Sequence, residues 1–205
     1  MKLFLLTAAL LSTVNVMAAP VGFEADTAGQ APAGWTCGAT GRGSAKWTVE
    51  ADADAPGKVL RQSGTATFPW CVKNDSGLTD GWVEVKFKPI SGHEDQAGGL
   101  VWRWKDGDHY YVARANALEN NVSLYYTAGG RRSTIKYVSA PVARNVWHRL
   151  RVEFGGKRIA VALDGKTYID LEDEHIAGPG AVGVWTKADS VTAFDDFAYG
   201  PSVSK

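Results

Sequence analysis

Short runs of alternating apolar and polar residues recur along this chain, and turn residues separate them. In the run 82–88, Val83, Val85 and Phe87 fall on one side of an extended backbone, because successive side chains of a β-strand point to opposite faces. The run 147–154 alternates in the same way. After the N-terminal segment, no stretch has the apolar spacing of an amphipathic helix. The pattern therefore predicts an all-β fold.

Turn signals indicate how these strands connect. Asp164-Gly165 lies between two alternating runs, and both residues tolerate the positive φ that a tight hairpin requires. Gly129-Gly130 follows another such run. Many short strands joined by turns of this kind favour two packed antiparallel sheets. We therefore expect an antiparallel β-sandwich of jelly-roll type.

The first 19 residues have the pattern of a secretory signal peptide. Lys2 precedes the apolar run 3–11, and Ala18 and Ala19 are small residues suited to a cleavage point. The apolar run is shorter than the about 20 residues that a membrane-spanning helix needs. We therefore expect residues 1–19 to be a cleaved signal and residues 20–205 to form a single domain. The protein is then exported to the periplasm or the extracellular space, without insertion into the membrane.

The charge balance and the cysteines narrow the choice of partners and compartment. The chain has 22 Lys and Arg residues against 22 Asp and Glu residues, so it offers no electrostatic reason to expect a nucleic acid partner. It has two cysteines, Cys37 and Cys71. In an exported protein such a pair favours a disulfide, and the alternative is two buried thiols.

The segment 97–116 predicts a hairpin with one apolar and one polar face. If Trp104 lies opposite Tyr111, the apolar residues share one face, whereas a slip of one residue would mix polar and apolar side chains. The other face then carries Arg103, Tyr110, Arg114 and Asn116. We expect these four residues to line the concave face of the sandwich and to contact a sugar. An aromatic ring can pack on the C–H face of a pyranose, while Arg and Asn donate hydrogen bonds to hydroxyl groups. The alternative is a solvated sheet on which the arginines pair with carboxylates.

Two further segments are candidates for the same site. Trp185 and Lys187 share one face of an extended run and together suit a sugar platform, although Trp185 equally suits the core. The polar loop 93–96 precedes the hairpin, at the rim of the expected concave face. Its alternative role is a solvated turn.

The sequence also resembles a known group of proteins. The motifs that carry the resemblance are Gly22-Phe23-Glu24, the run 97–103, Trp147-His148-Arg149-Leu150, Gly183-Val184-Trp185 and Phe194-Asp195-Asp196-Phe197. They resemble the concanavalin A-like lectin/glucanase superfamily, and most of all the secreted bacterial domains of the 3-keto-disaccharide hydrolase family. The resemblance implies a jelly-roll fold with a carbohydrate ligand on its concave face.

The resemblance also implies a cofactor. Many members of this superfamily hold a calcium ion between the first and last strands, and the hard oxygen ligands available here are Glu24, Asp195 and Asp196. The alternative for these carboxylates is a salt-linked strand end.

Catalysis is less well supported by the sequence. Glycoside hydrolysis generally uses two carboxyl groups about 5–10 Å apart. The inward positions of the second hairpin strand are Val112, Arg114 and Asn116, so the acid that the hydrolase family places there is missing. We therefore predict a carbohydrate-recognising domain. The first alternative is a glycoside hydrolase of the 3-keto-disaccharide type, and the second is an envelope-associated domain that binds protein.

Overall fold

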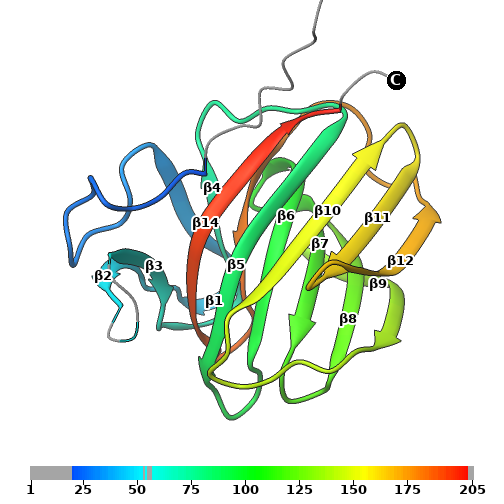
Figure 1. The fold of residues 1–205 in the computed structure, drawn as a ribbon. Coiled ribbons are helices and arrows are strands. Elements are labelled where there is room, and N and C mark those ends of the chain that lie inside the picture. The colour runs from blue at the N-terminus through cyan, green and yellow to red at the C-terminus, as the bar shows by residue number, and fades with distance from the viewer. Residues whose placement is uncertain (1–19, 53, 55–56, 203–205) are drawn as a thin grey trace, which may run out of the picture.

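The computed structural model describes residues 20–52, 54 and 57–202, and the signal peptide expected at residues 1–19 lies outside this part (Figure 1). The described residues form β-strands without an α-helix, so the all-β prediction is confirmed. The strands are β1 (Trp35–Ser44), β2 (Trp47–Ala51), β3 (Lys58–Gln62), β4 (Thr65–Lys73), β5 (Gly81–Ser91), β6 (Ala97–Asp106), β7 (His109–Asn116), β8 (Asn121–Ala128), β9 (Arg131–Ser139), β10 (His148–Gly155), β11 (Arg158–Leu163), β12 (Lys166–Glu172), β13 (Ala181–Trp185) and β14 (Val191–Pro201).

The strands form two seven-stranded antiparallel sheets that pack face to face. The order in the first sheet is β1-β4-β13-β6-β7-β8-β9, and the order in the second is β12-β11-β10-β5-β14-β3-β2. The predicted hairpin at Asp164-Gly165 joins β11 to β12, with Leu163 opposite Lys166. The prediction of a jelly-roll sandwich is therefore confirmed.

The core lies between the two sheets and follows the alternation in the sequence. Val83, Val85 and Phe87 of β5 are fully buried there. They belong to the same cluster as Leu100 and Trp102 of β6, because every second residue of each strand points inward. The residues between them point to the outer faces, which leaves each sheet one face for other uses.

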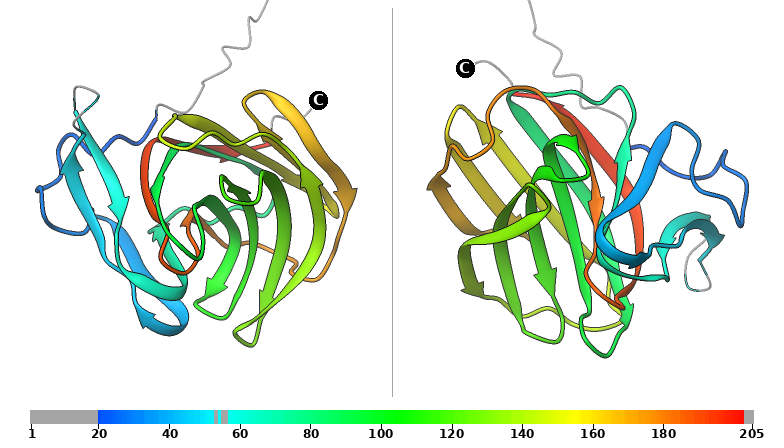
Figure 2. Two further views of the ribbon diagram at one scale, coloured as in Figure 1. Left: turned by 90° about the horizontal axis from the view of Figure 1, so that it is seen from below. Right: turned by 180° about the vertical axis from the view of Figure 1, so that it is seen from behind.

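The first sheet is strongly bent, as the two views of Figure 2 show. Strands β4 and β9 are five positions apart in the sheet order, which would be about 24 Å in a flat sheet. Nevertheless, the guanidinium carbon of Arg132 on β9 lies 4.6 Å from the ring centre of Phe68 on β4. The outer face of the first sheet is therefore concave, and its two sides meet.

A disulfide joins Cys37 of β1 to Cys71 of β4, which face each other in the strand pairing. The predicted pairing of the two cysteines is thus confirmed. Such a bond persists in oxidising compartments. It ties the outermost strand of the concave sheet to its neighbour.

Within the described ranges, no helix is long and apolar enough to cross a bilayer.

Candidate functional site

The hairpin β6–β7 has a different register from the predicted one. Trp102, not Trp104, lies opposite Tyr111. A shift of two residues leaves each side chain on its predicted face as far as Trp102. Beyond Trp102 the pairing is irregular, and Arg103 has a φ of 47°. This positive φ turns the strand over, so that Arg103 and Trp104 exchange faces.

Arg103 accordingly lies on the inner side of the first sheet, and its predicted position on the concave face is wrong. Its Nη1 donates to the carbonyl of Ile176 at 3.0 Å, and its Nη2 donates to the carbonyl of Gly156 at 2.8 Å. Its guanidinium also lies 5.8 Å from the ring centre of Phe154 in the core. The side chain is 3% exposed and serves to tie loops to the end of the sandwich.

The concave face carries a network of polar side chains centred on Asp95. This carboxylate is fully buried, and it accepts hydrogen bonds from Arg114 Nη1 at 3.2 Å and Asn116 Nδ2 at 2.9 Å. Lys187 Nζ lies 2.8 Å from the same carboxylate. The structure therefore brings together three of the predicted ligand-binding residues, namely Arg114, Asn116 and Lys187, around an acid that the sequence pattern did not single out.

A second layer of this network reaches the solvent. Arg114 Nη2 donates to Glu119 Oε2 at 2.5 Å and to Asn121 Oδ1 at 3.3 Å. Asn121 Nδ2 donates to Glu119 Oε2 at 2.7 Å. The side chain of Glu119 is 43% exposed, in contrast to the buried Asp95. We call the six residues Asp95, Arg114, Asn116, Glu119, Asn121 and Lys187 the polar cluster.

The two carboxyl groups of the polar cluster have pKa values shifted in opposite directions. Burial raises the pKa of Asp95, and the charges of Arg114 and Lys187 only partly oppose this effect. Burial alone would also raise the pKa of Glu119, but hydrogen bonds from Asn121 and Arg114, together with the charge of Arg114, lower it. Glu119 is thus held as a carboxylate at the surface.

Neighbouring loops hold the polar cluster in place. The carboxylate of Asp189 accepts backbone hydrogen bonds from His93, Glu94 and Asp95, at 2.6, 3.0 and 3.1 Å. Asn116 Oδ1 accepts from the backbone of Leu118 at 2.8 Å, which fixes the turn before Glu119. Both loops are therefore held by hydrogen bonds within the chain.

An exposed tyrosine, Tyr137, lies beside the polar cluster. It is opposite Ser123 on β8, which is itself opposite Arg114 on β7, so the three side chains share one face. The hydroxyl of Tyr137 is 3.0 Å from that of Tyr125. Tyr137 is 50% exposed, which is unusual for a large aromatic side chain.

The other two predicted aromatic residues, Tyr110 and Trp185, are fully buried on the concave face. The ring of Phe68 stacks on Trp185 at 5.7 Å, and Arg132 lies over Phe68. The hydroxyl of Tyr110 is 2.6 Å from that of Thr40, and burial raises its pKa. The centre of the concave face is therefore a second small core, which agrees with the alternative that Trp185 is a core residue.

We call the contact between Phe68 and Arg132 the clasp. Arg132 also lies 4.2 Å from the ring centre of Tyr125 and 5.7 Å from that of Trp185, so its guanidinium is held by aromatic rings from three strands. Nη1 of Arg132 has no hydrogen-bond partner among the described residues. The clasp lies next to the polar cluster, because Arg114 and Arg132 both lie over the ring of Tyr125.

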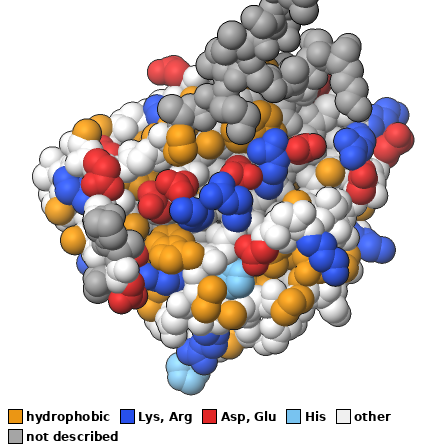
Figure 3. All heavy atoms as spheres, in the orientation of Figure 1, with side chains coloured by type: hydrophobic (Ala, Val, Ile, Leu, Met, Phe, Trp, Pro, Cys, Tyr) orange, Lys and Arg blue, Asp and Glu red, His pale blue; other side chains and the backbone are white. Residues whose placement is uncertain are grey.

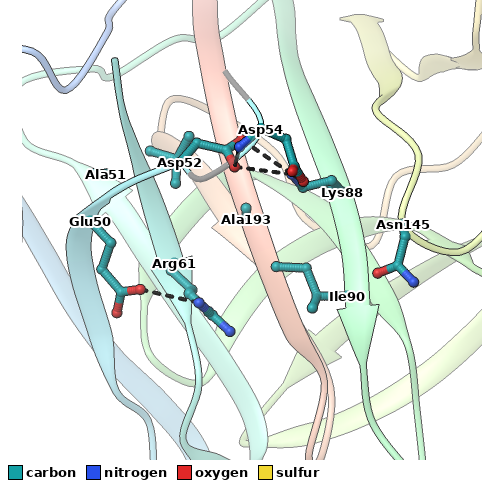
Figure 4. A pocket seen from close by; sticks show the side chains of 10 residues that line it. Glu50, Ala51, Asp52, Asp54, Arg61, Lys88, Ile90, Asn145 and Ala193 are labelled. Atoms are coloured by element: carbon teal, nitrogen blue, oxygen red, sulfur yellow. Dashed lines mark hydrogen bonds and ion pairs between the residues drawn. The ribbon is translucent and has the colours of Figure 1, made fainter. Parts of the chain in front are cut away.

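A pocket of about 270 Å³ opens on the outer face of the second sheet (Figure 4). Its charged side chains are already paired with one another. Lys88 Nζ lies 3.2 Å from both Asp52 and Asp54, and Arg61 lies 3.2 Å from Glu50. Figure 3 shows several acidic and basic side chains side by side on this face. We regard it as a solvated surface held by ion pairs.

The three carboxylates considered for calcium are Glu24, Asp195 and Asp196. Lys86 Nζ lies 2.5 Å from Asp196, and Glu24 accepts from the backbone of Lys58 at 2.9 Å. In the described part of the chain, no group of three or more His, Cys, Asp and Glu side chains is arranged to hold a metal ion. The geometry does not fit calcium at this strand end, and calcium binding stays an untested prediction.

Comparison with known proteins identifies the fold. No protein-family model matches the sequence, and no curated protein sequence is similar to it. Among solved structures, the carbohydrate-binding module CBM66 from Bacillus subtilis is similar, with a TM-score of 0.66 and 23% identity over 81% of this chain and 94% of that one. The β-glucanase of Bacillus licheniformis has a TM-score of 0.61 and 14% identity over 94% of this chain and 100% of that one. A Bacillus subtilis protein of unknown function with a galectin-like fold has a TM-score of 0.58 and 13% identity over 83% of this chain and 90% of that one.

These similarities confirm the concanavalin A-like fold. At such low identity they concern the fold alone, because one fold carries many functions. The predicted relationship to the 3-keto-disaccharide hydrolase family is not confirmed.

Proposed function

We propose that this protein is an exported carbohydrate-recognising domain that binds a glycan at the polar cluster. The observation that carries the proposal is the layered arrangement of the cluster. Glu119, Asn121 and Lys187 reach the solvent, and each rests on buried groups that already have partners. Because the side chains of such a site are already ordered, binding a ligand costs little of their conformational entropy.

The chemistry of the exposed groups suits sugar hydroxyls. The carboxylate of Glu119 accepts hydrogen bonds, whereas Lys187 donates them, and the amide of Asn121 does both. Tyr137 adds an exposed ring on the same face, against which the C–H face of a pyranose can pack. Carbohydrate-binding and carbohydrate-cleaving proteins of the same fold support this assignment.

One observation favours hydrolysis as a second candidate. Asp95 and Glu119 both contact Arg114, and their pKa values are shifted apart, which is the usual arrangement of an acid and a base in glycosidases. However, Asp95 has no exposed surface, and its oxygens are occupied by Arg114, Asn116 and Lys187. A buried acid of this kind cannot reach a glycosidic oxygen, so we favour binding.

The test is a panel of gluco-, xylo- and galacto-oligosaccharides, with 3-keto disaccharides included for the second candidate. Melting temperature and calorimetry measure binding, and mass spectrometry measures products. We expect binding without products. Glu119→Gln removes the charge from one acceptor and should weaken binding about tenfold or more. Tyr137→Ala should weaken it as well.

Two control variants lie on the second sheet. Glu153→Gln changes an exposed acid of β10, and Tyr168→Ala changes a partly exposed tyrosine of β12. Both should bind as the parent does. New product masses that disappear in Asp95→Asn would establish the hydrolase instead. If the Glu119 variant and its control bound the glycan equally well, the polar cluster would not be the binding site.

A further inference from the structure

A second pocket lies on the concave face, at the end opposite the polar cluster. The polar cluster borders the start of β6 and the end of β13, where Asp95 and Lys187 lie. The second pocket borders the end of β6 and the start of β13, at Trp104 and Ala181. Its volume is about 520 Å³, which is in the range of small-ligand sites. The buried side chains around Trp185 separate the two ends.

We call this cavity the Trp104 pocket. Its lining combines the aromatic ring of Trp104 with the polar side chains of Thr36, Lys73, Asn74, Asp75 and Ser76. Trp104 is partly exposed, and its ring lies 5.2 Å from that of Trp70 beneath it. It reaches this face only because of the bulge at Arg103.

Two polar groups in the wall of the Trp104 pocket have no partner. The carboxylate of Asp75 makes no hydrogen bond or ion pair with any residue in the described ranges. Asn74 accepts one hydrogen bond from Thr36 at 2.8 Å through Oδ1, while its amide nitrogen donates to no described residue. A free acceptor and a free donor therefore lie beside a partly exposed indole ring.

The turn that carries these two groups is rigid. Ser76 Oγ accepts from the backbone of Val182 at 3.0 Å and donates to the carbonyl of Lys73 at 2.5 Å. Asp75 has a φ of 57°, a conformation that Asp tolerates better than most residues. The disulfide between Cys37 and Cys71 lies next to Thr36 and Val72 and braces the two strands of the wall.

We propose that the Trp104 pocket is a second carbohydrate subsite, which takes one neutral pyranose unit. The ring of the sugar packs on Trp104, and its hydroxyls bind the carboxylate of Asp75 and the amide of Asn74. A neutral sugar fits because the only formal charges in the lining, on Lys73 and Asp75, are opposite. This subsite does not depend on the polar cluster, since the buried ring of Trp185 lies on β13 between Ala181 and Lys187.

The experiment titrates the mature, disulfide-bonded protein with methyl β-glucoside, methyl β-galactoside and methyl β-xyloside, and follows backbone and indole N–H signals by NMR. We expect at least one glycoside to shift the signals of residues 74–77 and the indole of Trp104. Trp104→Leu should lower the affinity measured at these signals about tenfold or more.

A second variant guards against misfolding of Trp104→Leu. Asp75→Gly removes the carboxylate at a position whose positive φ suits glycine, and Asn145→Gly is its matched control, because Asn145 also has a φ of 57°. Asp75→Gly should weaken binding, and Asn145→Gly should not. Glu119→Gln should leave these signals unchanged, so a failure at the polar cluster is distinguished from a failure here. If no glycoside shifts residues 74–77 up to its solubility limit, or if Asp75→Gly binds as the parent does, the proposal is wrong.

Discussion

At the scale of single residues, the polar cluster depends on carboxylates that are held by several donors at once. Asp189 is the clearest case. Burial on its own would raise its pKa, but the backbone N–H groups of His93, Asp95 and Glu94 lower it. A folded-state pKa below the unfolded value means that Asp189 stabilises the fold above the unfolded pKa of about 4. This stabilisation is lost as the pH falls through the folded value.

The first prediction follows from the lowered pKa of Asp189. Asp189→Asn keeps the shape of the side chain but removes its charge, so the free energy of unfolding at pH 7 should fall by about 1–2 kcal/mol. The difference from the parent should shrink as the pH falls below about 4, and it should vanish once the pH passes the lower pKa of Asp189 in the folded parent. Urea denaturation at pH 7 and at acidic pH measures the free energy of unfolding of both proteins. Glu94→Gln is the control within the same turn, and a difference that does not change with pH would refute the explanation.

The second prediction concerns Arg103. Arg103→Ala leaves the carbonyls of Thr79, Gly156 and Ile176 without their donor, so it should destabilise the protein by about 3 kcal/mol. Glycan binding at a temperature where the variant is folded should match the parent. Calorimetry on the variant decides the point. If the variant lost glycan binding but kept the stability of the parent, Arg103 would belong to the binding site.

At the scale of strands, the alternation of side chains predicted the faces of β5, β10 and the hairpin as far as Trp102. It failed at Arg103, because a positive φ at a residue other than glycine leaves no mark in the hydrophobic pattern. Asp95 and Glu119 were missed for a related reason. They lie in loops, where no periodicity shows which way a side chain points, although the loop 93–96 was expected at the rim of the face.

The clasp could not be predicted from the sequence either, because the contact between β4 and β9 arises from the bend of the whole sheet. The third prediction tests it. Phe68→Ala removes the ring that stacks on Trp185, so the buried indole should become accessible and its N–H should exchange faster with solvent. NMR measures the exchange rate. Phe68→Leu, which keeps part of the cover, should change it less, and equal protection in the parent and the Ala variant would show that Phe68 does not cover Trp185.

The disulfide provides the fourth prediction. Replacing both Cys37 and Cys71 by Ala frees two strands that are linked over a separation of 34 residues, and should lower the free energy of unfolding by about 2–4 kcal/mol. Binding at the polar cluster, which lies on other strands, should persist. Denaturation and calorimetry of the double variant test both parts. A loss of binding at a temperature where the variant is folded would contradict the separation of the two ends.

At the scale of the whole molecule, the two sheets differ in what their outer faces offer. The second sheet carries charges that neutralise one another, as the pairs of Lys88 and Arg61 illustrate. The concave first sheet carries polar groups that reach the solvent at each end and a closed aromatic centre between them. The fold was predictable from alternation and turns, and similar structures agree with it. The site was predictable only in part, because it depends on bulges, loops and the bend of the sheet.

The proposed function requires that a glycan binds at the polar cluster. The most direct measurement is an NMR titration of the backbone amides with the oligosaccharide that raises the melting temperature most. We expect the signals of Glu119, Asn121, Tyr137 and Lys187 to shift together and to saturate with one affinity. Shifts confined to the pocket of the second sheet, around Glu50, Lys88 and Asn145, would contradict it.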